Sequence, residues 1–146
     1  MGSPSLAPVA TSPRFDAALL ILRIASGIVF LYHGSAILFG AFGGPGPQKF
    51  AAFMHAPAVI GYLVGLAQFL GGLAILLGLL VRVGAVCIIV VMLGAIFLVH
   101  LPHGFDVTKG GVEYALTQLL IALALLLSGA GRYSLSGILA GGLRKL

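Results

Sequence analysis

Residues 56–101 form one apolar run in which Arg82 is the only charged residue. As a single helix this run would be roughly 70 Å long, at 1.5 Å per residue. The hydrocarbon core of a bilayer is only about 30 Å thick. The run therefore has to fold back on itself, and Arg82, which lies between Gly78 and Gly84, marks the expected turn.

The composition requires a membrane rather than water around the chain. Charged residues make up 8% of its 146 residues, against about 25% in a soluble domain. Hydrophobic residues make up 60% and the mean hydropathy is +1.19. We therefore expect an integral membrane protein whose main partner is the lipid bilayer. The net charge of +5 comes from scattered basic residues, which argues against a nucleic-acid partner.

Four segments have the length and apolar character of membrane-spanning helices. The Gly-Pro-rich residues 40–47 end the first of them, and a short interfacial helix is expected over residues 48–55. The predicted fold is an all-α four-transmembrane-helix bundle over residues 16–136, between a disordered N-terminal tail (1–15) and a C-terminal cytoplasmic tail (137–146). The predicted spans are Asp16–Phe39, with Asp16 as the N-cap, Val59–Leu80, Val83–Leu101 and Val112–Ser128.

Basic residues predict the orientation, because cytoplasmic loops carry more Lys and Arg. One side of the expected bundle collects Arg14, Arg82, Arg132, Arg144 and Lys145, whereas the other has only Lys49 and Lys109. The prediction is a multi-pass protein of the inner membrane with both termini in the cytoplasm.

The second half of the chain repeats part of the first. A Gly-x-x-Phe-Leu-x-His pattern begins at Gly27 and again at Gly94, and residues 68–82 align with 118–132. The alternative is that any two leucine-rich hairpins align this well. If the repeat is real, two helical hairpins are related by rotation about the membrane normal.

Polar residues in the outer half of the predicted bundle are the candidate binding residues. Polar groups at membrane depth face the bundle interior, where they pair with one another or with a ligand. The residues that can converge there are His33, Gln68, His100, Glu113 and Gln118. They form either a ligand site or a hydrogen-bond network that fixes helix register. Glu113 could instead cap the last helix.

Arg23 lies ten residues before His33 on the same predicted helix, about 15 Å deeper. We expect it near the inner interface, where its guanidinium can reach water while its stem packs on apolar surface. Packing and anchoring are therefore its expected role.

Several motifs together resemble the DoxX-like membrane proteins. They are Arg23, Tyr32-His33-Gly34, Gly71-Gly72, the stretch 100–105, Gly110-Gly111-x-Glu113 and the stretch 131–135. The resemblance covers about residues 16–136 and implies a four-helix inner-membrane bundle that works with oxidoreductase systems. Relatives form the quinone-reactive membrane subunit of thiosulfate:quinone oxidoreductase or help to anchor redox enzymes. Family members often carry a lysine where Ile37 stands and a glutamate where Gln68 stands.

Two functions are compatible with these features. In the first, the chain is a quinone-interacting subunit whose histidines and glutamines bind the quinone carbonyls, with electrons supplied by a soluble or membrane redox partner. In the second, it is a non-catalytic membrane scaffold or anchor for a partner protein. A further alternative makes His33 and His100 axial ligands of a haem. A homo-oligomer is compatible with all three.

Overall fold

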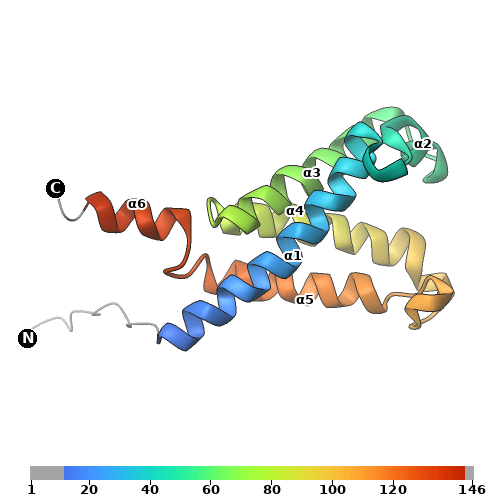
Figure 1. Cartoon of the computed structure of the whole chain (residues 1–146). Coiled ribbons are helices and arrows are strands. Elements are labelled where there is room, and N and C mark those ends of the chain that lie inside the picture. Colours follow the sequence, from blue (N-terminus) through green and yellow to red (C-terminus); the bar gives the residue numbers. More distant parts are fainter. Residues whose placement is uncertain (1–11, 144–146) are drawn as a thin grey trace, which may run out of the picture.

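The computed structural model describes residues 12–143, and within that range it contains helices and no strand. Figure 1 shows the long helices α1, α3, α4 and α5 packed into a bundle, with the shorter helices α2 and α6 at its ends. In chain order the α-helices are α1 (Pro13–Phe39), α2 (Gly46–Phe53), α3 (Ala58–Leu77), α4 (Val81–Ala95), α5 (Glu113–Ser128) and α6 (Leu135–Leu143). A π-helical turn, Ile96–His100, and a 3-10 turn, Leu101–His103, continue α4, and further 3-10 turns cover Ala41–Gly43 and Val107–Lys109.

The four predicted spans are confirmed as helices. Among the described residues, Pro13–Phe39, Ala58–Leu77 and Val81–His103 are long and apolar enough to cross a membrane, and Glu113–Ser128 is a shorter apolar helix. The fold-back also occurs, but it precedes Arg82: α3 ends at Gly78, which has φ 74°, and Leu80 has φ 51°. Arg82 itself belongs to the first turn of α4.

Two details at the termini differ from expectation. The N-cap of α1 is Ser12, whose hydroxyl accepts a hydrogen bond from the Phe15 N–H, so the prediction that Asp16 caps this helix is wrong. Asp16 lies inside the first turn and is buried. Helix α6, which was not predicted, overlaps the start of the expected C-terminal tail. Residues 1–11 of the N-terminal tail, and Arg144 and Lys145, lie outside the described residues.

Helices α1 and α3 form the most extensive contact of the bundle, and α4 packs against both α3 and α5. Helix α5 also touches α1, which closes the bundle. In Figure 1 the α1–α3 pair and the α4–α5 pair diverge toward the end that carries α2. We call this end, with the loop between α4 and α5, the loop end. The opposite end, where α1 begins, is called the basic end.

Small residues allow α1 and α3 to approach closely. A Cβ added to Gly72 would lie 2.9 Å from the Leu31 backbone nitrogen, and one added to Gly65 would lie 2.8 Å from Leu38 Cγ. Lipid tails are as apolar as leucine, so helices in a bilayer gain by such close van der Waals packing rather than by leaving water. The glycines therefore determine which faces of the two helices meet.

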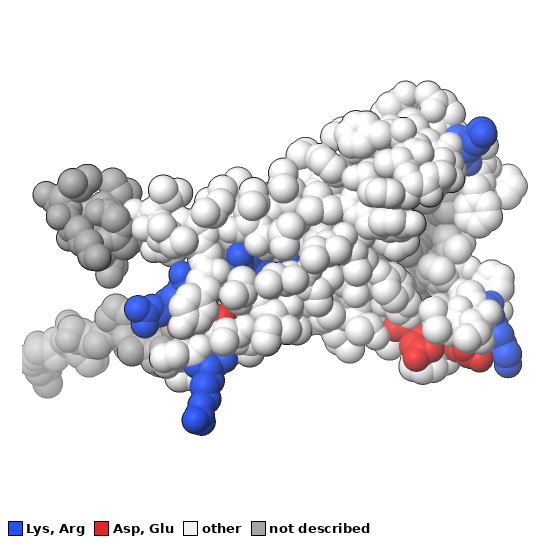
Figure 2. All heavy atoms as spheres, viewed as in Figure 1, with Lys and Arg blue, Asp and Glu red and all other residues white. Residues whose placement is uncertain are grey.

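Charged side chains gather at the two ends of the molecule, and the face shown in Figure 2 has almost none in the band between them. Large apolar side chains are exposed on the membrane-spanning helices and the π-helical turn, among them Ile21, Ile28, Val90, Phe97 and Leu120. A contiguous apolar surface of this kind would be unfavourable in water. The chain is therefore embedded in a membrane, with its helices in contact with lipid.

The proposed repeat of two hairpins remains a prediction, and the equivalent positions have different surroundings. Gly27 is pressed against Leu76 of α3, whereas nothing lies within 4 Å of a Cβ added to Gly94. His33 lies in a regular α-helix, whereas His100 ends a π-helical turn. The second hairpin is thus less tightly packed at the position that corresponds to Gly27.

Candidate functional site

Arg23 donates hydrogen bonds to four backbone carbonyls, and it is only 2% exposed. Its Nε donates to the Ile75 carbonyl at 2.9 Å, and one terminal nitrogen donates to the Leu76 carbonyl at 2.9 Å. The other terminal nitrogen donates to the carbonyls of Ala130, at 2.9 Å, and Tyr133, at 2.7 Å. The expectation that Arg23 reaches out to water at the interface is therefore wrong.

The geometry of Arg23 explains why it is buried. The last carbonyls of a helix have no partner within it, and Ile75 and Leu76 lie in the last turn of α3. The carboxyl end of a helix also carries partial negative charge, which favours a cation there. The planar guanidinium offers several donors in one plane, so a single side chain can join α3 to the link between α5 and α6.

Asp16 supports the same junction. Its carboxylate accepts a hydrogen bond from the backbone N–H of Arg132 at 3.0 Å. Ser136, in the first turn of α6, joins this helix to the end of α3, because its hydroxyl donates to the Gly78 carbonyl at 2.8 Å. The basic end is thus built from polar side chains that bind backbone atoms. This network is structural, in agreement with the packing role expected for Arg23.

At the loop end, His100 and Glu113 bind the loop that joins α4 to α5. His100 Nδ1 lies 2.6 Å from the Gly110 carbonyl oxygen, so this nitrogen carries the proton and donates. The Glu113 carboxylate accepts from the Val107 N–H at 3.1 Å. His100, before the loop, and Glu113, after it, thus each make a hydrogen bond to a backbone atom of the loop.

The same loop contains an Asx turn at Asp106. The carboxylate of Asp106 accepts from both the N–H of Thr108, at 2.9 Å, and its hydroxyl, at 2.8 Å. These hydrogen bonds favour the charged form, so they hold the pKa of Asp106 below its usual range. The loop is therefore a structured element rather than an extended connection.

His33 lies near the loop end of α1, among aromatic rings. Its ring is 5.4 Å from that of Tyr32 and 6.3 Å from that of Tyr114, the second residue of α5. The Tyr32 ring stacks on Phe42, 4.8 Å away. Tyr114 was not among the predicted site residues. The signal that could have found it is its spacing, because it lies four residues, about one helical turn, before Gln118.

The two glutamines are buried in the bundle, with exposed fractions of 6% for Gln68 and 7% for Gln118. The buried oxygen of the Gln118 amide has no hydrogen-bond partner among the described residues. A buried polar atom without a partner costs about 1–3 kcal/mol. Such an atom is usually paired with water or with a bound molecule.

Neighbouring contacts indicate the levels of these residues along the bundle. A Cβ added to Gly34 would lie 2.8 Å from Phe69 Cβ, so His33 and Gln68, which precede these residues, lie at a similar level on α1 and α3. Tyr114 joins His33 to α5, and Gln118 follows one turn deeper. Gln68 and Gln118 are thus buried at the loop end, whereas His33 is exposed beside Tyr114, so the bundle does not enclose its ring. The contacts of His100 and Glu113 are with the loop.

Comparison with known proteins agrees with this architecture. A sequence model of the DoxX family, described as DoxX, matches residues 18–101. CatD of Bacillus subtilis (strain 168), whose name gives oxidoreductase as a proposed activity, is 28% identical over 116 residues, 80% of this chain and 82% of CatD. The membrane protein Rv3486 of Mycobacterium tuberculosis (strain ATCC 25618 / H37Rv) is 35% identical over 129 residues, 81% of this chain and 78% of that protein. No solved structure matches significantly. The matched region covers α1, α3 and α4, and the chain belongs to the DoxX family.

Proposed function

We propose that this protein is a membrane subunit of a redox system and that it binds a quinone or quinol at the loop end of the bundle. The observation that carries the proposal is the buried amide oxygen of Gln118, which has no hydrogen-bond partner among the described residues; Gln118 lies one helical turn after Tyr114, whose ring neighbours that of His33. Membership of the DoxX family and the name of CatD support a role in redox chemistry.

The side chains at this level match the chemistry of a quinone head group. A quinone presents two carbonyl acceptors, and a quinol presents two hydroxyl donors. An amide has both a donor and an acceptor end, an imidazole has one of each when neutral, and a phenol can act in either sense. Gln118, His33 and Tyr114 can therefore bind either redox form, with Gln68 at the same level on α3. The isoprenoid tail of the quinone would pack against the apolar surfaces of the helices.

His33 is suited to exchange a proton with the ligand, because an imidazole changes its charge in the physiological pH range. His100 and Glu113 act as positioning residues in this proposal, since they hold the loop above the site through the Gly110 carbonyl and the Val107 N–H. The electrons come from a partner redox protein.

Binding can be tested with a photoreactive azidoquinone added to the purified protein in mild detergent. Gln118→Leu removes the amide and keeps a similar volume, and it should weaken labelling about tenfold, as expected for about 1.4 kcal/mol. Thr117→Val is the matched control, because Thr117 is exposed on the same helix and its hydroxyl binds its own helix at the Glu113 carbonyl.

Equal labelling of the protein, of Gln118→Leu and of Thr117→Val would contradict quinone binding at this site. In that case the scaffold function is favoured. It would be supported if affinity purification from native membranes recovers the same redox partner with His33→Ala as with the unaltered chain.

The proposal includes the predicted orientation, with both termini in the cytoplasm and the loop end facing outward from the inner membrane. It rests on the excess of arginine at the basic end. In a Cys87→Ser background, a cysteine at position 46 should react with an impermeant thiol reagent added to intact cells, and one at position 3 should not. The reverse pattern would overturn the orientation.

A further inference from the structure

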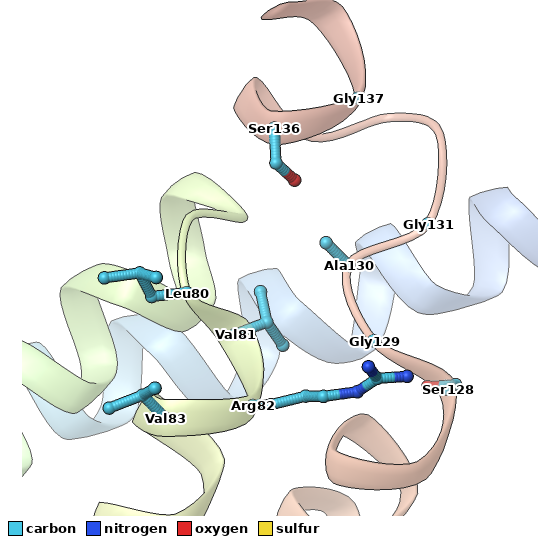
Figure 3. A pocket seen from close by; sticks show the side chains of 10 residues that line it. All are labelled: Leu80, Val81, Arg82, Val83, Ser128, Gly129, Ala130, Gly131, Ser136 and Gly137. Carbon is cyan, nitrogen blue, oxygen red and sulfur yellow. The ribbon is translucent and has the colours of Figure 1, made fainter. Parts of the chain in front are cut away.

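A groove of about 540 Å³ opens at the basic end, far from the site proposed above. Figure 3 shows that its walls come from three segments: the start of α4, the end of α5 with the following link, and the start of α6. The lining residues used below are Leu80, Arg82, Val83, Ser128 and Ser136. None of them takes part in the quinone proposal.

The polar side of the groove is formed by Arg82. Its side chain runs across the groove toward Ser128 and Gly129 (Figure 3). Its Nε donates to the Leu126 carbonyl at 3.2 Å. The two terminal nitrogens make no hydrogen bond to described residues, so the guanidinium can receive an anion without giving up its structural contact.

The rim of the same groove is apolar and faces lipid. Leu80 is 74% exposed and Val83 is 59% exposed, and Leu127, beside the lining residue Ser128, is 81% exposed. Leu80 and Val83 lie at the start of α4, and Leu127 lies in the last turn of α5. A molecule that suits both parts needs an anionic head next to an acyl chain.

We propose that this groove binds an anionic phospholipid, with its phosphodiester on the Arg82 guanidinium and its acyl chain along Leu80, Val83 and Leu127. Arginine suits a phosphate because its planar fork of donors matches the phosphate oxygens. The arginines at this end, which include Arg14 and Arg132, attract anionic lipid to it. A soluble phosphate compound would satisfy Arg82 but would leave the apolar rim uncovered, so a lipid is the better occupant.

Thermal unfolding of the full chain in a zwitterionic detergent tests the proposal. Phosphatidylglycerol, phosphatidylcholine or inorganic phosphate is titrated in, and the midpoint of unfolding is followed. We expect a saturable rise with phosphatidylglycerol and no comparable rise with the other two. Arg82→Gln should shift the half-saturating lipid concentration at least about tenfold upward, since it removes a charge-assisted hydrogen bond. Arg132→Gln, which removes an exposed arginine outside the groove lining at the same end, should shift this concentration much less than Arg82→Gln does.

Val83→Glu provides a second variant that leaves Arg82 and its bond to Leu126 in place. A carboxylate in the first turn of a helix is favourable for folding, but here it would repel a lipid phosphate. Val83→Gln is its uncharged control. The proposal predicts that only the glutamate abolishes the response to phosphatidylglycerol.

Three results would overturn the lipid site. They are an equal response to phosphatidylcholine, an equal response to inorganic phosphate, and an unchanged response in both Arg82→Gln and Val83→Glu. The first indicates a general effect of lipid and the second a site for soluble anions. The third places any lipid effect elsewhere on the molecule.

Discussion

Replacing Arg23 by methionine should destabilise the bundle more than the loss of any exposed arginine. The change keeps the apolar stem and removes the donors for four backbone carbonyls, those of Ile75, Leu76, Ala130 and Tyr133. Two of these carbonyls belong to the end of α3 and two to the link after α5. The substitution therefore removes the hydrogen bonds that Arg23 of α1 makes to both segments.

The magnitude follows from those four bonds. A buried acceptor that loses its donor costs about 1–3 kcal/mol. The Ile75 carbonyl still accepts from the Gly78 N–H at 3.3 Å, so the other three carbonyls would together cost about 3–9 kcal/mol. Removing the buried guanidinium also removes its desolvation penalty, which is several kcal/mol for a buried ion, and water can reach some of the carbonyls at the end of the bundle. We expect a net loss of about 3 kcal/mol, or about 6–12 °C in the midpoint of thermal unfolding for a protein of this size.

Cys87 provides the assay. It is the only cysteine of the chain and is half-buried on α4, and a Cβ added to Gly71 of α3 would lie 3.5 Å from its Cβ. A fluorogenic maleimide that reacts with Cys87 on heating in detergent therefore reports separation of α3 from α4.

Two variants serve as controls for Arg23→Met. Arg132→Met removes an exposed guanidinium at the same end and should shift the midpoint little. Arg23→Lys keeps the charge but cannot bind two helix ends at once. Its unfolding midpoint should therefore lie between those of Arg23→Met and Arg132→Met. A midpoint for Arg23→Met within about 2 °C of the unaltered chain would refute the reasoning, as would an equal shift in Arg132→Met.

Two further predictions concern packing and the loop. Gly27→Ala should lower the midpoint of thermal unfolding, because the added Cβ would lie 2.8 Å from Leu76 Cβ. Gly94→Ala should leave the midpoint unchanged or raise it, because that position is open and alanine is the better helix former. Equal losses in the two variants would contradict the difference in packing between the two glycines. Below pH about 3.8, the Asx turn at Asp106 should lose its stabilisation. The pKa of Asp106 is lower in the folded than in the unfolded state. The stabilisation from its carboxylate is therefore complete above the pKa of the unfolded state and is lost as the pH falls through the pKa of the folded state. Hydrogen exchange of the Thr108 amide, corrected for the intrinsic pH dependence, measures this, and unchanged protection at pH 2.5 would contradict it.

From their distance to predicted helix ends, His33, Gln68 and Gln118 were expected in the outer half of the bundle, and their membership of one binding site stays a prediction. The structure brings the neighbours of His33 and Gln68 together, since a Cβ added to Gly34 would lie 2.8 Å from Phe69 Cβ. Tyr114 was missed, because an aromatic residue at the membrane interface has many ordinary reasons to be there. Its approach to His33 depends on how α1 crosses α5, which local sequence does not specify.

The sequence by itself determined that the chain is a membrane protein, and it determined where the chain turns. These features depend on local composition: residues 56–101 are too long and too apolar to cross a bilayer once, and the glycine- and proline-rich residues 40–47 cannot continue a helix. Tertiary structure decided the partners of the polar side chains. Arg23 binds carbonyls that follow it by 52 to 110 positions in the chain, and nothing near it in sequence indicates them. A buried donor binds the unpaired carbonyls that helix packing places near it. That packing depends on contacts between segments distant in sequence.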